Sequence, residues 1–292
     1  MSKGAPSGLL ELHVAVLLFG GTALFSKLIP LGALDITVFR CAIAALVLAL
    51  IVKLSHQPIR LRHLADYGIA LILGVIVSLH WVTYFASMQM SSVAIGMIAF
   101  FTYPVMTVLV EPMVNGTRLQ LQDIICGIAV LTGVALLIPE ASLGNDVTLG
   151  ILIGILSAAL FTARNLLHKR YFAQYSGPQA MFYQTAVAAV FLGSFVESNP
   201  TELDASVWQL LLLLGVVFTA MPHALFTSAL RHLSAKTVGL VSCLQPFYGT
   251  VLALLLLGES PSSSTLIGGL LVVATAVFET TQSHRSQRQK KA

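Results

Sequence analysis

The amino-acid sequence predicts an all-α membrane protein in which ten transmembrane helices form two inverted five-helix repeats. Three observations lead to this prediction: the composition is strongly apolar, the apolar residues fall into ten segments, and lysine and arginine gather in alternate loops. Of the 292 residues, 57% are hydrophobic and 10% are charged, whereas an ordinary soluble domain is about 25% charged. A soluble fold of this size cannot hide so much apolar surface from water, so a lipid bilayer is the expected surrounding.

Each apolar segment is long enough to cross a bilayer as an α-helix, which takes about 20 residues. Turn-forming residues separate the segments, as in the runs 30–32 and 198–200. We expect the first repeat to occupy residues 10–138, the second repeat residues 148–280, and a basic cytoplasmic tail residues 281–292. The expected spans are 10–29, 36–54, 67–87, 92–113, 121–138, 148–168, 179–196, 207–230, 237–257 and 265–280.

Lysine and arginine lie almost entirely in the loops on one side of the predicted bundle. With an even number of spans both termini share that side, and its loops hold 13 of the 16 Lys and Arg residues, whereas the opposite loops hold none. Under the positive-inside rule this asymmetry places both termini in the cytoplasm. The membrane we expect is a bacterial cell inner membrane. The loop cations are Lys3, Lys53, Arg60, Arg62, Arg118, Lys169, Arg170, Arg231, Lys236, Arg285, Arg288, Lys290 and Lys291.

A shift of 142 residues superimposes landmarks of the two halves, which indicates an internal repeat. Because each repeat holds an odd number of helices, the second copy enters the membrane upside-down, a recurrent construction of transporters. Chance matching within an apolar sequence of low complexity is the alternative. The matched pairs are Pro104 with Pro246, Gly127 with Gly269, and Trp81 with His223.

The motifs of the chain resemble those of the drug/metabolite transporter superfamily, in the group built from two EamA domains. In the second half the motifs lie between Phe226 and Gly269, and they include the small-residue turn 234–236, the mid-span Pro246 and the run 257–259. In the first half the motifs are the run 91–94 and Tyr103-Pro104. Arg40 is similar to an arginine common in that span, whereas Thr117 departs from the family's glutamate. The resemblance implies a ten-helix carrier with a central cavity lined by spans one to four and six to nine, and peripheral fifth and tenth spans.

Three cations fall inside predicted spans, where an ionised side chain costs about 2.5–3.5 kcal/mol or more and therefore marks a functional pathway by default. They are Lys27, Arg40 and Arg164. Lys27 and Arg164 lie near span ends, so snorkelling to the interface is an equal alternative for them. Arg40 is deeper, which favours a role in the pathway or in a structural pair.

Polar and aromatic side chains at similar depth form the candidate substrate-binding set, because a small-molecule site combines an apolar wall with a few placed polar groups. His80 and His223 could also couple transport to a proton gradient; the alternative is a neutral histidine that bonds a neighbouring helix. Pro104 and Pro246 either free a carbonyl into a wet cavity or simply kink their helices. The candidate binding residues are Arg40, His80, Trp81, Tyr84, Tyr103, Asn165, Gln184, His223 and Gln245.

We therefore expect a secondary active transporter, an exporter of amino acids or related small metabolites that works by alternating access. Acidic residues lie near span ends, so cations without a central acid favour a substrate that carries a carboxylate or phosphate. The alternatives are an importer or exchanger of another organic anion or nucleotide-type metabolite, and a sensor or assembly subunit without transport. No catalytic motif, metal site or cofactor site is present in the sequence. The expected partners are a small-molecule substrate and the lipid bilayer, with no nucleic acid, in a monomer or weak homodimer.

Overall fold

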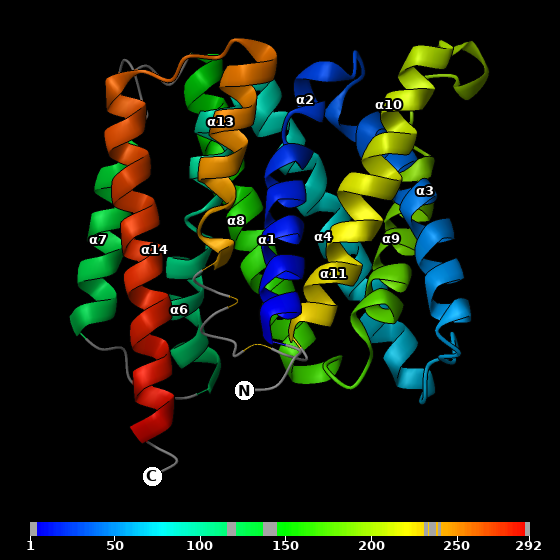
Figure 1. Cartoon of the computed structure of the whole chain (residues 1–292), viewed down its shortest axis with the longest axis horizontal. Helices are drawn as coiled ribbons and strands as arrows, with labels where there is room; N and C mark the ends of the chain where they lie inside the picture. Colours follow the sequence, from blue (N-terminus) through cyan, green and yellow to red (C-terminus); the bar gives the residue numbers. More distant parts are fainter. Residues whose placement is uncertain are drawn as a thin grey trace.

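The computed structural model describes residues 5–115, 121–136, 145–230, 233, 238 and 241–289 of the chain. These residues form helices joined by turns and loops, and they contain no β-strand. The long helices run roughly parallel to one another in alternating directions, and the first turn of α1 lies at the same end of the bundle as the last turn of α14 (Figure 1). This all-α architecture agrees with the predicted fold class.

The helices of the first half follow the expected spans, with two of the spans broken into shorter helices. The broken spans are 10–29, which becomes α1 and α2, and 92–113, which becomes α5 and α6. The bounds are α1 Ala5–Thr22, α2 Phe25–Leu28, α3 Ala33–Leu54, α4 Leu64–Met90, α5 Val93–Phe100, α6 Tyr103–Asn115 and α7 Leu121–Ala135.

The helices of the second half cover the remaining expected spans, although most of residues 231–240, where the ninth span should begin, lie outside the described part of the chain. The eighth span combines α10, a π-helical segment η2 and α11. The bounds are α8 Asp146–Tyr171, α9 Gly177–Gly193, the 3₁₀ turn η1 Pro200–Glu202, α10 Ala205–Gly215, η2 Val216–Ala220, α11 Met221–Leu230, α13 Gln245–Leu257 and α14 Ser263–Gln289.

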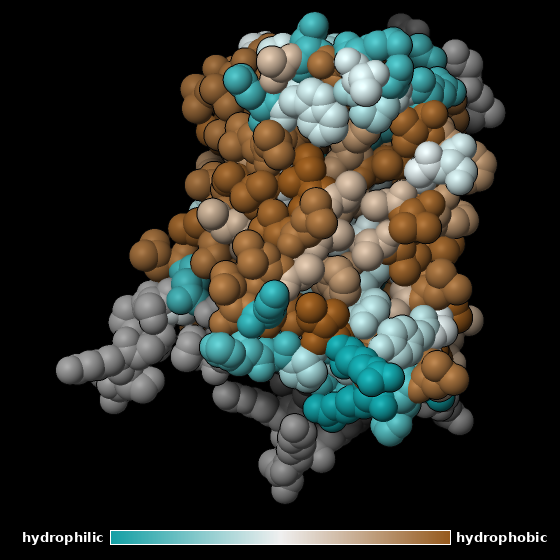
Figure 2. All heavy atoms as spheres, turned by 90° about the vertical axis from the view of Figure 1, so that its right-hand side faces the viewer, coloured by the Kyte–Doolittle hydropathy of each residue, from teal (hydrophilic) through white to brown (hydrophobic). Residues whose placement is uncertain are grey.

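Six of the described helical segments are long and apolar enough to cross a membrane, and three shorter apolar helices accompany them. The face shown in Figure 2 fits this reading, because an apolar belt lies there between two hydrophilic ends of the molecule. On α3, for example, Leu46, Leu50 and Leu54 recur every fourth residue and are 75%, 55% and 68% exposed. Residues with this spacing share one helix face. The chain is a multi-pass membrane protein.

Two helix breaks occupy equivalent places in the two halves of the chain. One turn at Phe101–Thr102 separates α5 from α6, and another at 243–244 precedes α13. Pro104 and Pro246 are each the second residue of the helix that follows the break. Proline is tolerated in a first helical turn because its missing N–H would have no helical partner there. The structure therefore places these prolines at helix starts rather than at bends within continuous helices.

Carbonyl groups near two of these irregular segments accept hydrogen bonds from threonine hydroxyls. Tyr103 O, next to the first break, accepts hydrogen bonds from Thr107 Oγ1 at 2.8 Å and from Thr162 Oγ1 at 3.2 Å. Pro222 has no N–H to give to the carbonyl of Phe218, four residues earlier. Thr22 Oγ1 of α1 donates to Phe218 O at 2.8 Å instead. At Phe218 O a side-chain hydroxyl thus takes the place of the missing backbone donor, as irregular backbone in a membrane requires.

Glycine allows a close helix crossing between α1 and α13. A Cβ atom added to Gly20 would lie 3.0 Å from both Gln245 O and Gly249 N, which are backbone atoms that cannot rotate away. A similar approach joins the peripheral helices, since a Cβ at Gly133 of α7 would lie 2.9 Å from Gly268 O of α14. These contacts are made within one chain, as small residues permit in membranes.

Replacing Gly20 with alanine is expected to destabilise the protein by about 1–3 kcal/mol, the usual cost of overpacking. Thermal denaturation in detergent should show a lower midpoint temperature for Gly20→Ala. The matched control is Gly68→Ala on α4, where the added methyl meets nothing within 4 Å. Removal of a helix-interior glycine there should leave the midpoint unchanged or raise it. Equal midpoints for the two variants would show that the α1–α13 crossing is looser than described.

Candidate functional site

A cavity of about 510 Å³ lies among the helices of both halves. Its described lining residues come from α1, α3, α4, α5, α6, α8, α9, η2, α11 and α13 and from the loops beside α8 and α13. None of them belongs to α7 or α14, which pack together at one side of the bundle (Figure 1). The lining therefore uses the helices of spans one to four and six to nine, as the family resemblance implied.

The cavity reaches the end of the bundle that holds the first turn of α1. His168 near the end of α8, Ala173 in the α8–α9 loop, Tyr175 and Gly177 all line it. None of its described lining residues comes from the loops at the opposite end, such as 29–32 or 194–204. The structure is therefore a conformation whose cavity faces the end where the chain starts.

Arg40 of α3 is a buried cation in the cavity wall, with 2% of its surface exposed. Its guanidinium carbon lies 4.3 Å from the ring centre of Trp81 and 5.1 Å from that of Phe85. Such cation–π contacts compensate part of the lost hydration. Its Nε and Nη1 atoms are buried and have no hydrogen-bond partner among the described residues.

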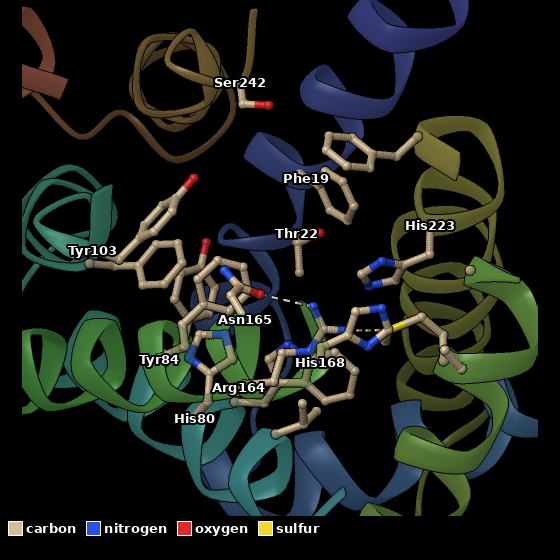
Figure 3. Close-up of a pocket in the computed structure, with 18 of the residues that line it drawn as sticks. Phe19, Thr22, His80, Tyr84, Tyr103, Arg164, Asn165, His168, His223 and Ser242 are labelled. Atoms are coloured by element: carbon tan, nitrogen blue, oxygen red, sulfur yellow. Dashed lines mark hydrogen bonds between the residues drawn. The ribbon is translucent and has the colours of Figure 1, made fainter. Parts of the chain in front are cut away.

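Arg164 of α8 lines the same cavity, and each nitrogen of its guanidinium has a neutral partner; Figure 3 shows the bond to Asn165. Nε donates to Gln184 Oε1 at 2.8 Å, Nη1 donates to Asn165 Oδ1 at 3.0 Å, and Nη2 lies 3.2 Å from Met181 Sδ. Gln184 is itself fully buried and is not a lining residue. The structure thus places Gln184 behind Arg164, as a positioning group, rather than in the cavity wall.

The described lining residues include no aspartate or glutamate. Acidic side chains instead bond groups at the two ends of the bundle. Asp35 accepts hydrogen bonds from the backbone N–H and the hydroxyl of Ser198, and Glu259 Oε2 accepts one from Val93 N at 2.9 Å. Glu111 Oε1 lies 2.6 Å from Lys169 Nζ. The cavity therefore carries two guanidinium charges without an acidic counter-charge among its described lining residues.

His80 is held by Ser157 of α8. Ser157 Oγ donates to His80 O at 3.0 Å and lies 2.8 Å from His80 Nδ1. Because that hydroxyl has only one proton, Nδ1 must carry the ring hydrogen and donate to Ser157 Oγ. The rings of Phe100 and Phe161 flank the imidazole at 5.3 and 5.0 Å between centres.

His223 lies across the cavity, with its ring centre 4.9 Å from Phe19 and 6.4 Å from Trp81. His80 and His223 stand on opposite sides of the space in Figure 3. Proton coupling through either histidine stays a prediction, because the structure fixes their positions and not their titration.

Lys27 lies apart from the cavity. From the sequence, a role in the pathway and snorkelling to the interface were equal alternatives for this residue. Its Nζ donates to Gln89 O and Ser91 O, each at 3.1 Å. The Gln89 side chain in turn donates to Ser26 O at 3.2 Å and to Leu31 O at 2.8 Å. Lys27 thus ties α2 to the end of α4 at the closed end of the bundle.

The other sequence-selected residues lie together in the wall. Trp81, Tyr84 and His80 project from α4, Tyr103 from α6, Asn165 from α8 and Gln245 from α13. Tyr84 and Tyr103 both pack against Phe100, at 5.2 and 5.1 Å between ring centres. An aromatic wall with a few polar atoms results.

Several lining residues were missed from sequence, and the 142-residue shift contains the signal that would have found them. Six pairs of lining residues are separated by that number of positions. Only the pair of Trp81 and His223 was noticed from sequence. The pairs are Phe19 and Phe161, Thr22 and Arg164, Trp81 and His223, Tyr84 and Phe226, Phe100 and Ser242, and Tyr103 and Gln245.

These features define a multi-pass α-helical membrane protein whose helices enclose a cavity of small-molecule size, which is the build of a membrane transporter. The chain belongs to the EamA-like transporter family, whose model matches residues 6–138 and 148–281. This membership confirms the family predicted from sequence, and it identifies a transporter rather than an enzyme.

Curated relatives are similar over most of their length. The chain is 24% identical to the uncharacterized transporter YxxF of Bacillus subtilis, over 94% of this chain and 89% of the relative. It is 26% identical to the threonine/homoserine exporter RhtA of Escherichia coli, over 89% and 86%. It is 25% identical to the pseudopaline exporter CntI of Pseudomonas aeruginosa, over 85% and 86%. A solved crystal structure shares the fold, with a TM-score of 0.65 at 18% identity over 94% of this chain and 98% of that chain.

Replacing Gln184 with methionine is expected to lower stability by about 1–3 kcal/mol, because Arg164 Nε would be left buried without an acceptor. The variant keeps the length and most of the volume of the side chain. Thermal denaturation in detergent measures the effect, and Gln174→Met at an exposed loop position is the matched control. A midpoint for Gln184→Met equal to that of the control would show that Arg164 does not depend on this bond.

Proposed function

We propose that the chain is a secondary active transporter that exports amino acids or related small metabolites across the bacterial inner membrane by alternating access. The observation that carries the proposal is the cavity itself, whose lining residues pair at a spacing of 142 positions. A site built from equivalent positions of two halves can be exposed to either side of a membrane when the halves rock against each other.

The paired lining residues support an architecture of ten transmembrane helices in two inverted repeats. Phe19 and Phe161 project from the first helices of their halves, and Tyr103 and Gln245 each start a helix that follows a break. The breaks at 101–102 and 243–244 are themselves 142 positions apart. Helices of the two halves that lie equally far along the chain run in opposite directions, as inversion requires (Figure 1).

The distribution of basic residues supports an orientation with both termini in the cytoplasm. The loop between α8 and α9, which borders the cavity mouth, follows Lys169 and Arg170. In this orientation the described conformation is open to the cytoplasm and closed to the outside, where Lys27 and Asp35 make their hydrogen bonds. This is the conformation in which an exporter takes up its substrate.

Export of amino acids is supported by the relatives and by the chemistry of the wall. RhtA is described as a threonine/homoserine exporter and CntI as a pseudopaline exporter. Two guanidinium groups without an acidic neighbour among the described lining residues favour a molecule with an anionic group over a bare cation. The cavity volume lies within the range of about 300–1,000 Å³ that is typical of small-molecule sites.

Counterflow in proteoliposomes tests the proposal. Vesicles loaded with unlabelled L-threonine or L-homoserine should accumulate the labelled amino acid transiently, because a carrier exchanges solute without net driving force. Phe161→Trp should lower the initial rate about tenfold or more, since a larger ring in the cavity competes with substrate for space; tenfold corresponds to about 1.4 kcal/mol.

The matched control is Phe278→Trp, the same substitution at a position of α14 that is 45% exposed on the outer surface. Its counterflow rate should equal that of the unaltered protein. A panel of amino acids, organic anions and nucleotides extends the assay to other substrates. Absence of counterflow with every member, from protein that is folded by thermal denaturation, would contradict transport and favour a sensor or assembly subunit.

A further inference from the structure

We propose that Arg40 is the docking point for the anionic group of the transported molecule, and that this group is a carboxylate. The first observation is the contrast between the two arginines of the cavity. The guanidinium nitrogens of Arg164 contact Gln184, Asn165 and Met181. Arg40 Nε and Nη1, in contrast, have no acceptor among the described residues. Each nitrogen of Arg164 thus has a partner, whereas two buried nitrogens of Arg40 have none, so Arg40 is the cation with the greater unmet hydrogen-bonding capacity.

The second observation is the fixed orientation of the Arg40 guanidinium. The rings of Trp81 and Phe85 lie 4.3 and 5.1 Å from its central carbon, and both side chains are buried. Ring contacts compensate the charge without accepting the strong in-plane hydrogen bonds of the N–H groups. The side chain is therefore positioned in advance, and a planar carboxylate is the partner that such a fork matches best.

The third observation is the missing counter-charge. A buried cation without an anion is costly, and the described residues of the wall offer Arg40 no carboxylate. Arg164 lines the same cavity and adds a second positive charge. An entering carboxylate therefore gains from both charges and hydrogen-bonds to Arg40, while an amine without a carboxylate is repelled.

The wall also provides a place for a second polar group of the same molecule. Tyr84 lines the cavity, and its buried hydroxyl makes no hydrogen bond of ordinary geometry in the described part of the chain. Phe100 and Tyr103 continue that wall as stacked rings with centres 5.1 Å apart. An amino acid fits this division, with its carboxylate at Arg40 and its ammonium or hydroxyl near the aromatic wall.

The role in substrate selection rests on the proposed transport function, whereas carboxylate binding at Arg40 can be measured without transport. The chain has two tryptophans, Trp81 and Trp208. In a Trp208→Phe background, Trp81 is the sole tryptophan, and its fluorescence reports on the neighbouring guanidinium. The probes are L-threonine with L-threoninamide, and acetate with acetamide, each titrated at constant ionic strength; inorganic phosphate is a further probe.

We expect saturable fluorescence changes with the two carboxylates and weak responses to the two amides. Arg40→Gln should weaken carboxylate binding about ten- to hundredfold, as loss of a charge-assisted hydrogen bond predicts, and should hardly change amide binding. Arg40→Lys, which keeps the charge, should lie between. Arg62→Gln, at an exposed arginine outside the cavity, is the matched control and should bind all probes as the background protein does.

Several outcomes would overturn the proposal. They are equal binding of acid and amide to the background protein, an equal loss of both in folded Arg40→Gln or Arg40→Lys protein, no response to any carboxylate, and a preference for phosphate over both carboxylates. Counterflow separates this proposal from the proposed function. Carboxylate binding at Arg40 without counterflow would contradict transport but not the binding of a carboxylate at Arg40. Counterflow that is unchanged in Arg40→Gln would contradict the role of Arg40 but not transport.

Discussion

The requirement that backbone N–H and C=O groups be bonded within the protein governs this structure, because the hydrocarbon of a bilayer offers them nothing. Regular helices meet the requirement almost everywhere. The exceptions within the described spans are the breaks at 23–24, 101–102 and 243–244 and the π-helical segment η2, and residues at or beside all four line the cavity. Thr162 and Thr22 donate to Tyr103 O and Phe218 O near two of these places. Irregular backbone thus occurs where protein or the cavity can satisfy it.

The same scarcity of polar partners governs how charge is arranged. Acidic side chains lie at the ends of the bundle, where Asp35, Glu259 and Glu111 each find a donor. The cavity in between holds Arg164, whose three guanidinium nitrogens each have a neutral partner, and Arg40, two of whose nitrogens have none among the described residues. A cavity in which a pre-positioned cation lacks hydrogen-bond partners is suited to a molecule that carries an anionic group.

The sequence predicted well those features that depend on composition along the chain. Apolar length located the helices, and the resemblance to the EamA group located the cavity between the correct spans. The sequence predicted that Arg40 faces the pathway or a partner, because a charge within an apolar span is costly and therefore rare elsewhere. Pro104 and Pro246 indicated irregular backbone near two of the breaks, but the sequence did not show that one helix ends and another begins there, and it did not indicate the π-helical segment.

Side-chain direction was also beyond the sequence. Gln184 and Lys27 both lie within expected spans, and both were candidates for the substrate pathway. In the structure Gln184 accepts a hydrogen bond from Arg164 behind the cavity wall. Lys27 instead joins α2 to the end of α4 at the closed end of the bundle. Helices that are apolar on every side show little periodicity, so the sequence does not say which face meets the cavity. Phe161 was missed for this reason, although its spacing of 142 positions from Phe19 marks it.

The central claim is that one cavity, shared by two inverted halves, opens in turn to each side of the membrane. The most direct measurement is alkylation of a single cysteine, Thr22→Cys, in a protein without its three native cysteines, by a membrane-impermeant reagent added from one side or the other. Gln174→Cys and Glu202→Cys, exposed at opposite ends, mark the two sides. The account predicts labelling of Thr22→Cys from both sides, with substrate changing the ratio of the two rates. Labelling from one side alone under every condition, while both markers react as expected, would contradict it.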